Sequence, residues 1–402
     1  MNSCGLIVEY NPFHNGHVYH IQEAKKQTSA DCMIAVMSGS FLQRGEPAII
    51  DKYHRARAAL SIGIDLVVEL PYAYAVQNSD LFAKGAVQTL NAALVNSICF
   101  GSESGHIEPF HEAYNVMQTH DELYQSILKQ ELNKGKSFPK AHEIAFQQLP
   151  NFQSNHFLDL SAPNNILGYS YLKEILDHGL NILPYTIKRT KSGYHDTSIQ
   201  SEIASATAIR KSILEHETIP KNTMPDSTYN ELIAYEQKTS HLHFWEAYFP
   251  LLQYRVLTMS IEELNDIHGM DEGLEYRIKQ TAKEAQSIED WITKVKTKRY
   301  TWTRVQRLFT HLLTNTKKSD MSSIQKTTQP TYIRILGMNH TGRAYVNQYK
   351  NDFTLPILTR YSKKQPELLS IEERASHAYY SILPPNIKKK LYQRELSGPI
   401  IL

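Results

Sequence analysis

The amino-acid sequence predicts an α/β protein with a parallel sheet in its N-terminal part and a mainly helical C-terminal part. Three observations support this fold class. Short apolar runs, typical of buried strands, alternate with helical patterns through the first half of the chain. A polar stretch punctuated by prolines, Pro220–Thr239, then marks a boundary. Beyond it helical patterns predominate, so we expect a first domain over residues 1–220 and a helical region over 221–402, with a small mixed segment at 331–402.

Composition restricts the class of protein. The 402 residues are enough for two or three domains, and 41% hydrophobic with 21% charged residues is ordinary for a soluble protein. The net charge is only +2, so any nucleic-acid surface must be a local patch. No apolar run has the length of a membrane span and no signal peptide precedes the first strand, so we expect a cytoplasmic protein. Cys4, Cys32 and Cys99 lie in apolar runs and are predicted to be buried thiols, without metal or disulfide.

The first apolar run, Gly5–Val8, suits a buried strand and is too short for a helix. The loop after it contains Pro12, which biases Asn11 away from helical angles. A helix follows, with Asn15 as its expected N-cap. A strand, a tight loop and a helix N-terminus form a typical anion site, because free backbone N–H groups and the helix dipole point at one spot.

Further strands and helices alternate along the first domain. Strands are expected at Cys32–Met37, Asp65–Leu70, Ser97–Phe100 and Asn181–Lys188, and helices at Asp51–Ser61, Ser79–Leu94, Pro163–His178 and Ser201–His216. This alternation predicts a Rossmann-like parallel sheet covered on both faces. Such sheets bind ligands beyond the carboxyl ends of their strands, so the loop after Val8 and Gly101-Ser102 should face one crevice.

The C-terminal part shows no internal repeat. Its helices are expected at His241–Leu257, Gly273–Lys294 and Trp302–Thr314. A polar linker, Lys317–Pro330, leads to strand-like segments at Tyr332–Gly337 and Thr354–Thr359 and to a closing helix near Ile371–Ile382.

Two histidines, His14 and His17, lie at the expected anion site. His-x-Gly-His at a strand–loop–helix junction resembles the nucleotidyltransferase branch of the HIGH superfamily, where this motif holds the α-phosphate of ATP. Gly16 lets the helix backbone approach a nucleotide, and the imidazoles can donate hydrogen bonds to charge that builds in the transition state. The alternative is a pair of ordinary surface histidines, but the position after a strand and before a helix favours the nucleotide site.

A second segment, Ile203–Arg210, resembles the ISSTxIR signature of the same superfamily. Ser205 and Thr207 can donate to the β- and γ-phosphates, and Arg210 can neutralise the leaving pyrophosphate. The segment departs from the signature, because Ala206 replaces a common Ser and position 208 is not Lys. Phosphate contacts can then come from Lys188 and Arg189. A capped helix with a solvated Arg is the alternative, which the upstream histidine motif disfavours.

The loop and helix at Met37–Arg57 have an unusual composition. Gln43–Pro47 is polar, and Lys52, Arg55 and Arg57 follow it. This segment could hold an acyl or phosphate group or clamp an RNA, and a solvated basic helix is an equally good interpretation.

Eight basic residues and no acid occupy Lys294–Lys318. Arg304, Arg307 and His311 share one helical face, and Tyr300 and Trp302 lie among the basic residues. Basic residues interleaved with aromatic rings suit looped RNA, whereas a solvated face usually mixes signs. We therefore assign RNA binding to Lys298, Arg299, Tyr300, Trp302, Arg304 and Arg307.

Together IVEYNPFHNGHVYH, MSGSFLQRGEPAIIDKYHRAR, APNNILGYSYLK, IASATAIR and KRYTWTRVQRLFTHLL resemble the bacterial tRNA(Met) cytidine acetate ligase family over nearly the whole chain. The resemblance implies a ligase that uses ATP and acetate to form 4-acetylcytidine at the wobble position of elongator tRNA(Met). The ATP site that it implies comprises Ile7, Val8, Glu9, Tyr10, Asn11, Pro12, Phe13, His14, Asn15, Gly16, His17, Val18, Tyr19, His20, Gly101, Asn164, Asn165, Lys188 and Arg189.

This chemistry suits the candidate residues. Acetate would be activated as acetyl-adenylate, with His14, His17 and Arg210 as the catalytic groups, and the weakly nucleophilic amine of cytidine would then depend on positioning. Mg²⁺ suits the role of phosphate counter-ion, although the sequence shows no ligand set for it, and no protein partner is indicated. Two alternatives are a small-metabolite adenylyltransferase, such as a pantetheine-phosphate or nicotinate-mononucleotide enzyme, and an RNA-binding protein with a relic nucleotide site.

Overall fold

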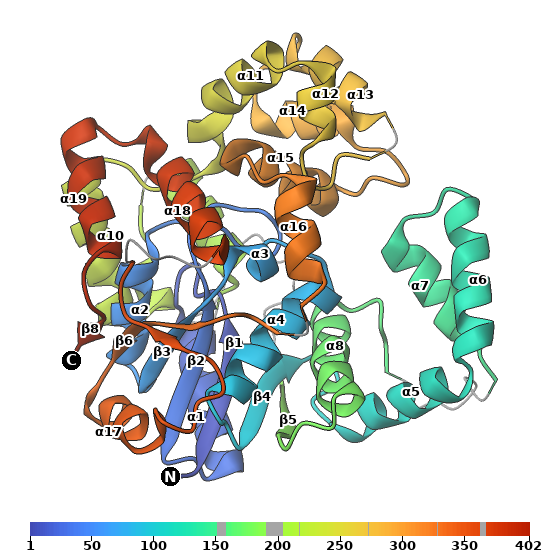
Figure 1. Cartoon of the computed structure of the whole chain (residues 1–402). Helices are drawn as coiled ribbons and strands as arrows, with labels where there is room; N and C mark the ends of the chain where they lie inside the picture. Colours follow the sequence, from blue (N-terminus) through green and yellow to red (C-terminus); the bar gives the residue numbers. More distant parts are fainter. Residues whose placement is uncertain (151–157, 190–203, 217, 272, 328, 362–366) are drawn as a thin grey trace.

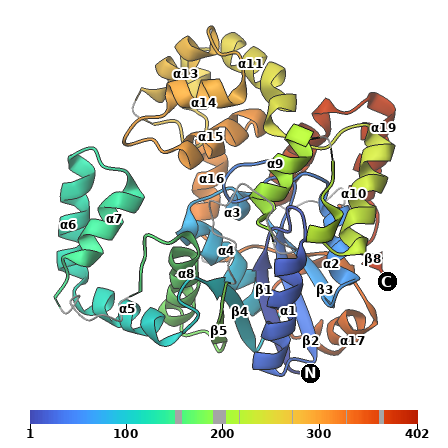
Figure 2. The ribbon, with the colours of Figure 1, turned by 180° about the vertical axis from the view of Figure 1, so that it is seen from behind.

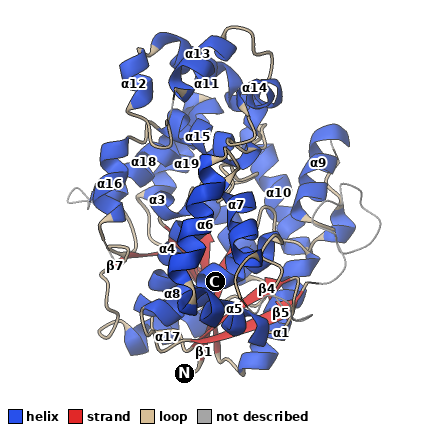
Figure 3. Ribbon diagram, turned by 90° about the vertical axis from the view of Figure 1, so that its right-hand side faces the viewer, coloured by secondary structure: helices blue, strands red, loops and turns tan. Residues whose placement is uncertain are grey.

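The structure is a computed structural model that describes residues 1–150, 158–189, 204–216, 218–271, 273–327, 329–361 and 367–402. A central sheet lies at one end of the molecule, and a bundle of short helices lies at the other (Figures 1 and 3). This arrangement confirms the predicted fold class.

The sheet has the strand order β5-β4-β1-β2-β3-β6-β7, with β8 paired to β6. Its strands are β1 (Ser3–Val8), β2 (Cys32–Ser38), β3 (Leu66–Leu70), β4 (Ser97–Ser102), β5 (Leu183–Lys188), β6 (Ile333–Met338), β7 (Ile357–Leu358) and β8 (Ile400–Ile401). The first five are parallel, as predicted. Successive residues of β2 point to opposite faces: Met33 and Ala35 belong to one buried cluster, and Ile34 and Val36 to the other.

Helices cover both faces of the sheet. The first domain contributes α1 (Asn15–Thr28), α2 (Lys52–Leu60), α3 (Tyr72–Ala75), α4 (Ser79–Ala92), α5 (Glu108–Thr119), α6 (Asp121–Asn133), α7 (Phe138–Gln147), α8 (Pro163–Asp177) and α9 (Ala206–His216). Helix α2 begins where the sequence predicts, because the Asp51 carboxylate accepts the N–H of His54 at 2.9 Å. Cys4, Cys32 and Cys99 are free, and they are buried as expected.

The helical bundle has its own core, in which Trp291, Phe309 and Leu312 are fully buried. The C-terminal part contains α10 (Asp226–Thr239), α11 (Phe249–Thr258), α12 (Ile261–Asn265), α13 (Leu274–Ala282), α14 (Ile288–Val295), α15 (Trp302–Thr314), α16 (Lys318–Gln325), α17 (His340–Tyr349), α18 (Glu367–Tyr379) and α19 (Pro385–Glu395). Short 3₁₀ turns cover Lys221–Thr223, Trp245–Tyr248 and Tyr380–Ile382. Helix α15 has the predicted bounds, whereas the predicted helix Gly273–Lys294 is two helices.

Two expectations about the boundary differ from the structure. Pro220–Thr239 is not only a linker: Pro225 precedes α10, whose Glu231 pairs with Arg57 of α2 at 3.0 Å. Proline suits a helix start, so it punctuates the chain here without ending its structure. The mixed segment also does not stay with the helical region, because β6 pairs antiparallel with β3 and extends the N-terminal sheet.

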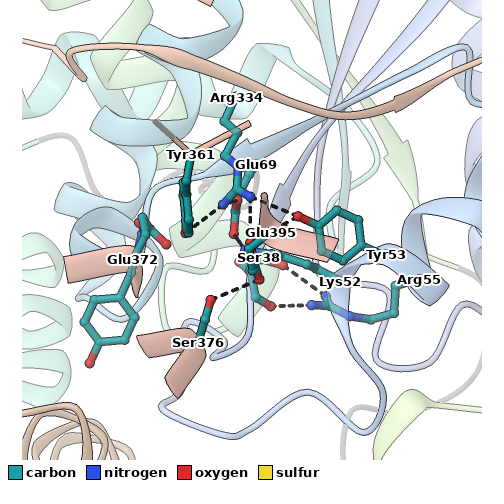
Figure 4. Close-up of polar contacts among 12 residues, drawn as sticks. Ser38, Lys52, Tyr53, Arg55, Glu69, Arg334, Tyr361, Glu372, Ser376 and Glu395 are labelled. Atoms are coloured by element: carbon teal, nitrogen blue, oxygen red, sulfur yellow. Dashed lines mark hydrogen bonds and ion pairs between the residues drawn. The ribbon is translucent and has the colours of Figure 1, made fainter. Parts of the chain in front are cut away.

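A buried network of ion pairs joins β6 to the first domain (Figure 4). Arg334 of β6 donates to Glu69 at 2.8 Å and to Glu395 at 2.6 Å, and Lys52 reaches the same two carboxylates at 2.7 and 3.0 Å. Burial alone would raise the pKa of Glu395, but the charges of Lys52 and Arg334 outweigh it and lower the pKa to about 2. Two cations therefore balance two carboxylates inside the protein.

Candidate active site

The loop between β1 and α1 presents the histidine motif. Its backbone turns sharply at Tyr10, which has a φ of 51°, and continues through a cis Asn11–Pro12 bond. The N-cap of α1 is His14 and not Asn15: the His14 ring accepts the N–H of Gly16 at 3.1 Å. The Asn15 amide instead donates to the carbonyl of Asn222 at 3.0 Å. The expected helix start is thus displaced by one residue, because an imidazole nitrogen can replace the usual carboxamide oxygen.

Both histidine rings are fixed by the backbone. Nδ1 of His17 accepts the N–H of His14 at 3.2 Å, and the two rings stack with centroids 3.8 Å apart. Because each Nδ1 accepts a hydrogen bond, each neutral ring carries its proton on Nε2. Burial, followed by the charges of Arg189 and Arg210, lowers the pKa of His14 to about 3, and burial also lowers the pKa of His17. The motif therefore holds two neutral N–H donors.

The ends of β4 and β5 lie beside this loop. Arg189, which follows β5, donates to the side chain of Asn164 at 3.1 Å, and a Cβ on Gly101 would lie 3.2 Å from the Arg189 side chain. Glu103 accepts the backbone N–H groups of Asn164 and Asn165 at 3.2 and 2.8 Å, so it occupies the N-terminus of α8. The structure brings Arg189, Asn164 and Gly101 together, and the side chains of both Lys188 and Arg189 are exposed.

Helix α9, seen in Figure 2, carries Arg210, whose contact with Asn11 brings it to the same loop. Arg210 donates to the carbonyl of Asn11 at 2.8 Å and pairs with Glu46 at 2.7 Å. Ser205 accepts the N–H of Ala208 at 3.1 Å, and Thr207 is exposed. Ile203, the first residue of this signature, and Ser201, the expected start of the helix, lie outside the described residues.

Two basic residues of the Met37–Arg57 segment are not on the surface. Lys52 belongs to the buried network. Arg55 is buried and donates to the carbonyls of Glu9 at 2.6 Å and Ser38 at 3.0 Å, so it ties the ends of β1 and β2 together. A solvated basic helix is therefore excluded for Lys52 and Arg55, because backbone carbonyls and buried carboxylates surround them.

The basic segment of α15 is less uniform than its sequence suggests. Arg304 pairs with Asp271 at 3.1 Å and lies over the ring of Tyr300, 4.5 Å from its centroid. Tyr300 is only 7% exposed and packs in the helical core, so its ring cannot stack on a base as expected. Trp302 is 38% exposed. Lys298 and Arg299 are exposed, and acids from α13 and α14 and their loops neutralise part of the patch.

The sequence left the role of the turn at Gln43–Glu46 open between an acyl or phosphate site, an RNA clamp and a solvated segment, and it did not predict the contacts of this turn. The Gln43 N–H donates to Glu9 at 2.7 Å, and Glu46 pairs with Arg210. Arg307 has no ion-pair partner among the described residues, and burial, then Arg304 and Arg44, lower its pKa to about 10. The contacts join residues far apart in the chain, so local sequence carried no signal for them. No group of His, Cys, Asp and Glu in the described ranges is arranged to hold a metal.

A parallel sheet with two neutral histidine donors at its carboxyl edge defines a nucleotidyltransferase. The model of the HIGH Nucleotidyl Transferase family matches residues 1–395, and the chain belongs to this family.

The relatives narrow this class to the tRNA(Met) cytidine acetate ligases. The protein of that name from Oceanobacillus iheyensis is 54% identical over the full length of both chains, and that from Bacillus subtilis is 44% identical over 94% of this chain and 92% of its own. The crystal structure of apo Thermotoga maritima TmcAL matches with a TM-score of 0.91, 33% identity and full coverage of both chains. The same protein bound with alpha-thio ATP matches with a TM-score of 0.90, 32% identity and full coverage of both chains.

Proposed function

We propose that this chain activates acetate with ATP as acetyl-adenylate and transfers the acetyl group to the 4-amino group of the wobble cytidine of elongator tRNA(Met). The product is 4-acetylcytidine, with AMP and pyrophosphate released. The observation that carries the proposal is the pair of neutral Nε2–H donors of His14 and His17 beside Arg210. The names of the relatives supply the substrate class.

The first step is an attack of acetate on the α-phosphate of ATP. The carboxylate oxygen forms a bond to phosphorus, and the bond to the leaving pyrophosphate breaks. Negative charge grows on the phosphate oxygens, where neutral donors held by the backbone stabilise it without reorganising. The positive charges of Arg210 and Arg189 both act on His14, so these two residues suit the departing pyrophosphate.

The second step needs tRNA close to the adenylate. The exposed cations Lys298 and Arg299, with Arg304 and Arg307 of α15, suit phosphate contacts, and Trp302 is exposed enough to stack on a base. The ring of Tyr300 packs against the guanidinium of Arg304 and does not itself contact the RNA. The hydroxyl of Thr310 on α15 donates to the carbonyl of Gly45, and this contact supports a tRNA surface close to the nucleotide site.

Mg²⁺ belongs to the proposal as a counter-ion carried by the ATP phosphates and water. No helix of the described residues is long and apolar enough to cross a membrane. We place the enzyme in the cytoplasm, where its tRNA substrate is found.

Incubation with ATP, labelled acetate and total tRNA, followed by nucleoside analysis, tests this function. Labelled 4-acetylcytidine should appear together with AMP. Transfer of an adenylyl group to a small metabolite, with no labelled tRNA, would instead favour the adenylyltransferase alternative. Binding of tRNA without any binding of ATP would favour a relic nucleotide site.

A further inference from the structure

Glu9 lies at the border between the nucleotide site and the turn at Gln43–Glu46. It directly follows β1, and Oε1 of its carboxylate accepts the Gln43 N–H at 2.7 Å. None of the ion pairs among the described residues involves Glu9, although it is partly buried. One carboxylate oxygen is thus held by the backbone, while the other has no protein donor in the described part of the chain.

The surroundings of Glu9 contain both signs of charge. The charged and titratable groups that face it are Glu46 and Arg44 from the turn, Arg210 from α9, Tyr171 from α8 and Arg55 from α2. Burial raises the pKa of Glu9 above its usual range, and the hydrogen bond from Gln43 opposes part of this rise. Arg210 also lowers the pKa of His14 and donates to the carbonyl of Asn11 in the histidine loop at 2.8 Å, so Glu9 and the histidine donors lie in one site.

The turn contacts Glu9 at one end and the basic helix at the other. The N–H of Gly45 donates to the carbonyl of Leu42 at 2.8 Å, and Gly45 packs directly on the backbone of Arg307. Gln43 and Gly45 are two residues apart, so at most about 7 Å separates their backbones. The carboxylate of Glu9 and the backbone of Arg307 therefore contact opposite ends of a short turn, and the guanidinium of Arg307 has no ion-pair partner among the described residues. The length of this turn suits the distance between the base and the phosphate of one nucleotide.

We infer that Glu9 is the proton acceptor of the transfer step, with the cytidine 4-amino group against its free oxygen and the nucleotide phosphate toward Arg307. Carboxylates are natural acceptors for this amino group. The nitrogen lone pair attacks the acetyl carbon, the bond from that carbon to the adenylate oxygen breaks, and AMP leaves with the electron pair. The proton lost from nitrogen passes to Glu9 and then to solvent. This inference rests on the proposed function.

Single-turnover transfer from synthetic acetyl-adenylate to tRNA tests Glu9 without the ATP-dependent step. Glu9→Gln keeps the bond to Gln43 through its amide oxygen but accepts no proton, so transfer should slow by about 100-fold. The wild-type rate should also fall as the pH drops below the raised pKa of Glu9, and this fall should be absent in Glu9→Gln. Glu46→Gln removes an equal charge from the same turn and should keep the fall.

A Glu9→Gln enzyme with the wild-type rate and pH profile would overturn the inference and leave the proposed function intact. A wild-type enzyme that makes no 4-acetylcytidine from acetyl-adenylate would instead overturn the proposed function. If thermal unfolding shows that Glu9→Gln folds poorly, Glu9→Asp tests the inference in its place. The shorter side chain draws the carboxylate back, so this variant should transfer the acetyl group at least about 10-fold more slowly, and its rate should still fall at low pH. A wild-type rate in Glu9→Asp would contradict the inference.

Discussion

The hydroxyl of Thr310 donates to the carbonyl of Gly45 at 2.6 Å, although 265 positions separate the two residues in the chain. Thr310 lies on α15, and Gly45 lies in the turn that contacts Glu9. The basic helix is therefore packed on the same turn that borders the nucleotide site. A change in this contact should alter the transfer of the acetyl group more than its activation.

Gly45→Ala tests this contact. Gly45 has a φ of 81°, and a Cβ there would come within 2.6 Å of the Arg307 backbone. Gly135→Ala is the matched control, because Gly135 has a φ of 78° and nothing within 4 Å of its added Cβ. Both variants carry roughly 1–3 kcal/mol of backbone strain, so denaturant unfolding should show the larger loss in Gly45→Ala. Equal losses would mean that the contact contributes nothing.

Loss of either histidine donor should slow adenylate formation. His14→Ala and His17→Ala should each reduce acetate-dependent exchange of pyrophosphate into ATP by about 100-fold or more, the usual cost of a lost donor to developing charge. The lowered pKa of His14, about 3, keeps its ring neutral, so exchange should not change as the pH crosses 6.5. His340→Ala, at an exposed site on α17, serves as control. Near-normal pyrophosphate release in His17→Ala would show that the histidine motif does not take part in adenylation.

Arg210→Ala should slow adenylation and leave tRNA affinity nearly intact. The guanidinium is held by Asn11 and Glu46 beside the histidine loop, far along the chain from α15. Lys211→Ala, on the same helix and paired with Glu215 at 3.7 Å, should change neither quantity. Exchange kinetics and filter binding measure the two steps separately. Loss of tRNA binding with normal adenylation would show that Arg210 belongs to the tRNA site and not to the ATP site.

Local patterns predicted the first domain well, because its signals lie within a few residues of one another. His14 and His17 hold each other and the start of α1 through contacts that span three residues or fewer, although the cap is His14 and not the expected Asn15. The cap of α2 by Asp51 is equally local. The alternation of such units sufficed to predict a parallel sheet and the edge at which the histidines lie.

Long-range partners could not be predicted in this way. Lys52 and Arg304 look like surface cations in the sequence, but Glu69 and Asp271, which pair with them, lie 17 and 33 positions away. Nothing in the sequence around β6 indicates that this strand pairs with β3. Its Arg334 has a buried partner in Glu395, 61 positions later, and only the folded chain brings these charges together.

Glu395→Gln tests the buried network. It leaves Lys52 and Arg334 with Glu69 as their remaining ionised partner among these contacts, so unfolding free energy should fall by about 3–5 kcal/mol. The folded pKa of about 2 lies below the ordinary value of 4.5, so this stabilisation is present above pH 4.5 and is lost as the pH falls toward 2. Denaturant unfolding should therefore show the two proteins converging in acid. Glu143→Gln, which breaks a surface pair, should cost less than about 1 kcal/mol.

The basic helix should hold the tRNA, while the first domain activates acetate independently. Arg304→Glu with Arg307→Glu should abolish tRNA acetylation but still produce acetyl-adenylate, because neither residue contacts the histidine loop. Each phosphate contact that is lost should weaken binding and flatten its salt dependence by about 0.9 units of slope. Lys389→Glu with Lys390→Glu makes the same charge change on exposed residues of α19, on another side of the molecule (Figure 1), and should alter acetylation little. Filter binding over a salt series measures the slope. An unchanged slope and affinity in the α15 variant would show that the tRNA binds elsewhere. Lys52 and Arg55 are buried and are therefore excluded as that other tRNA contact.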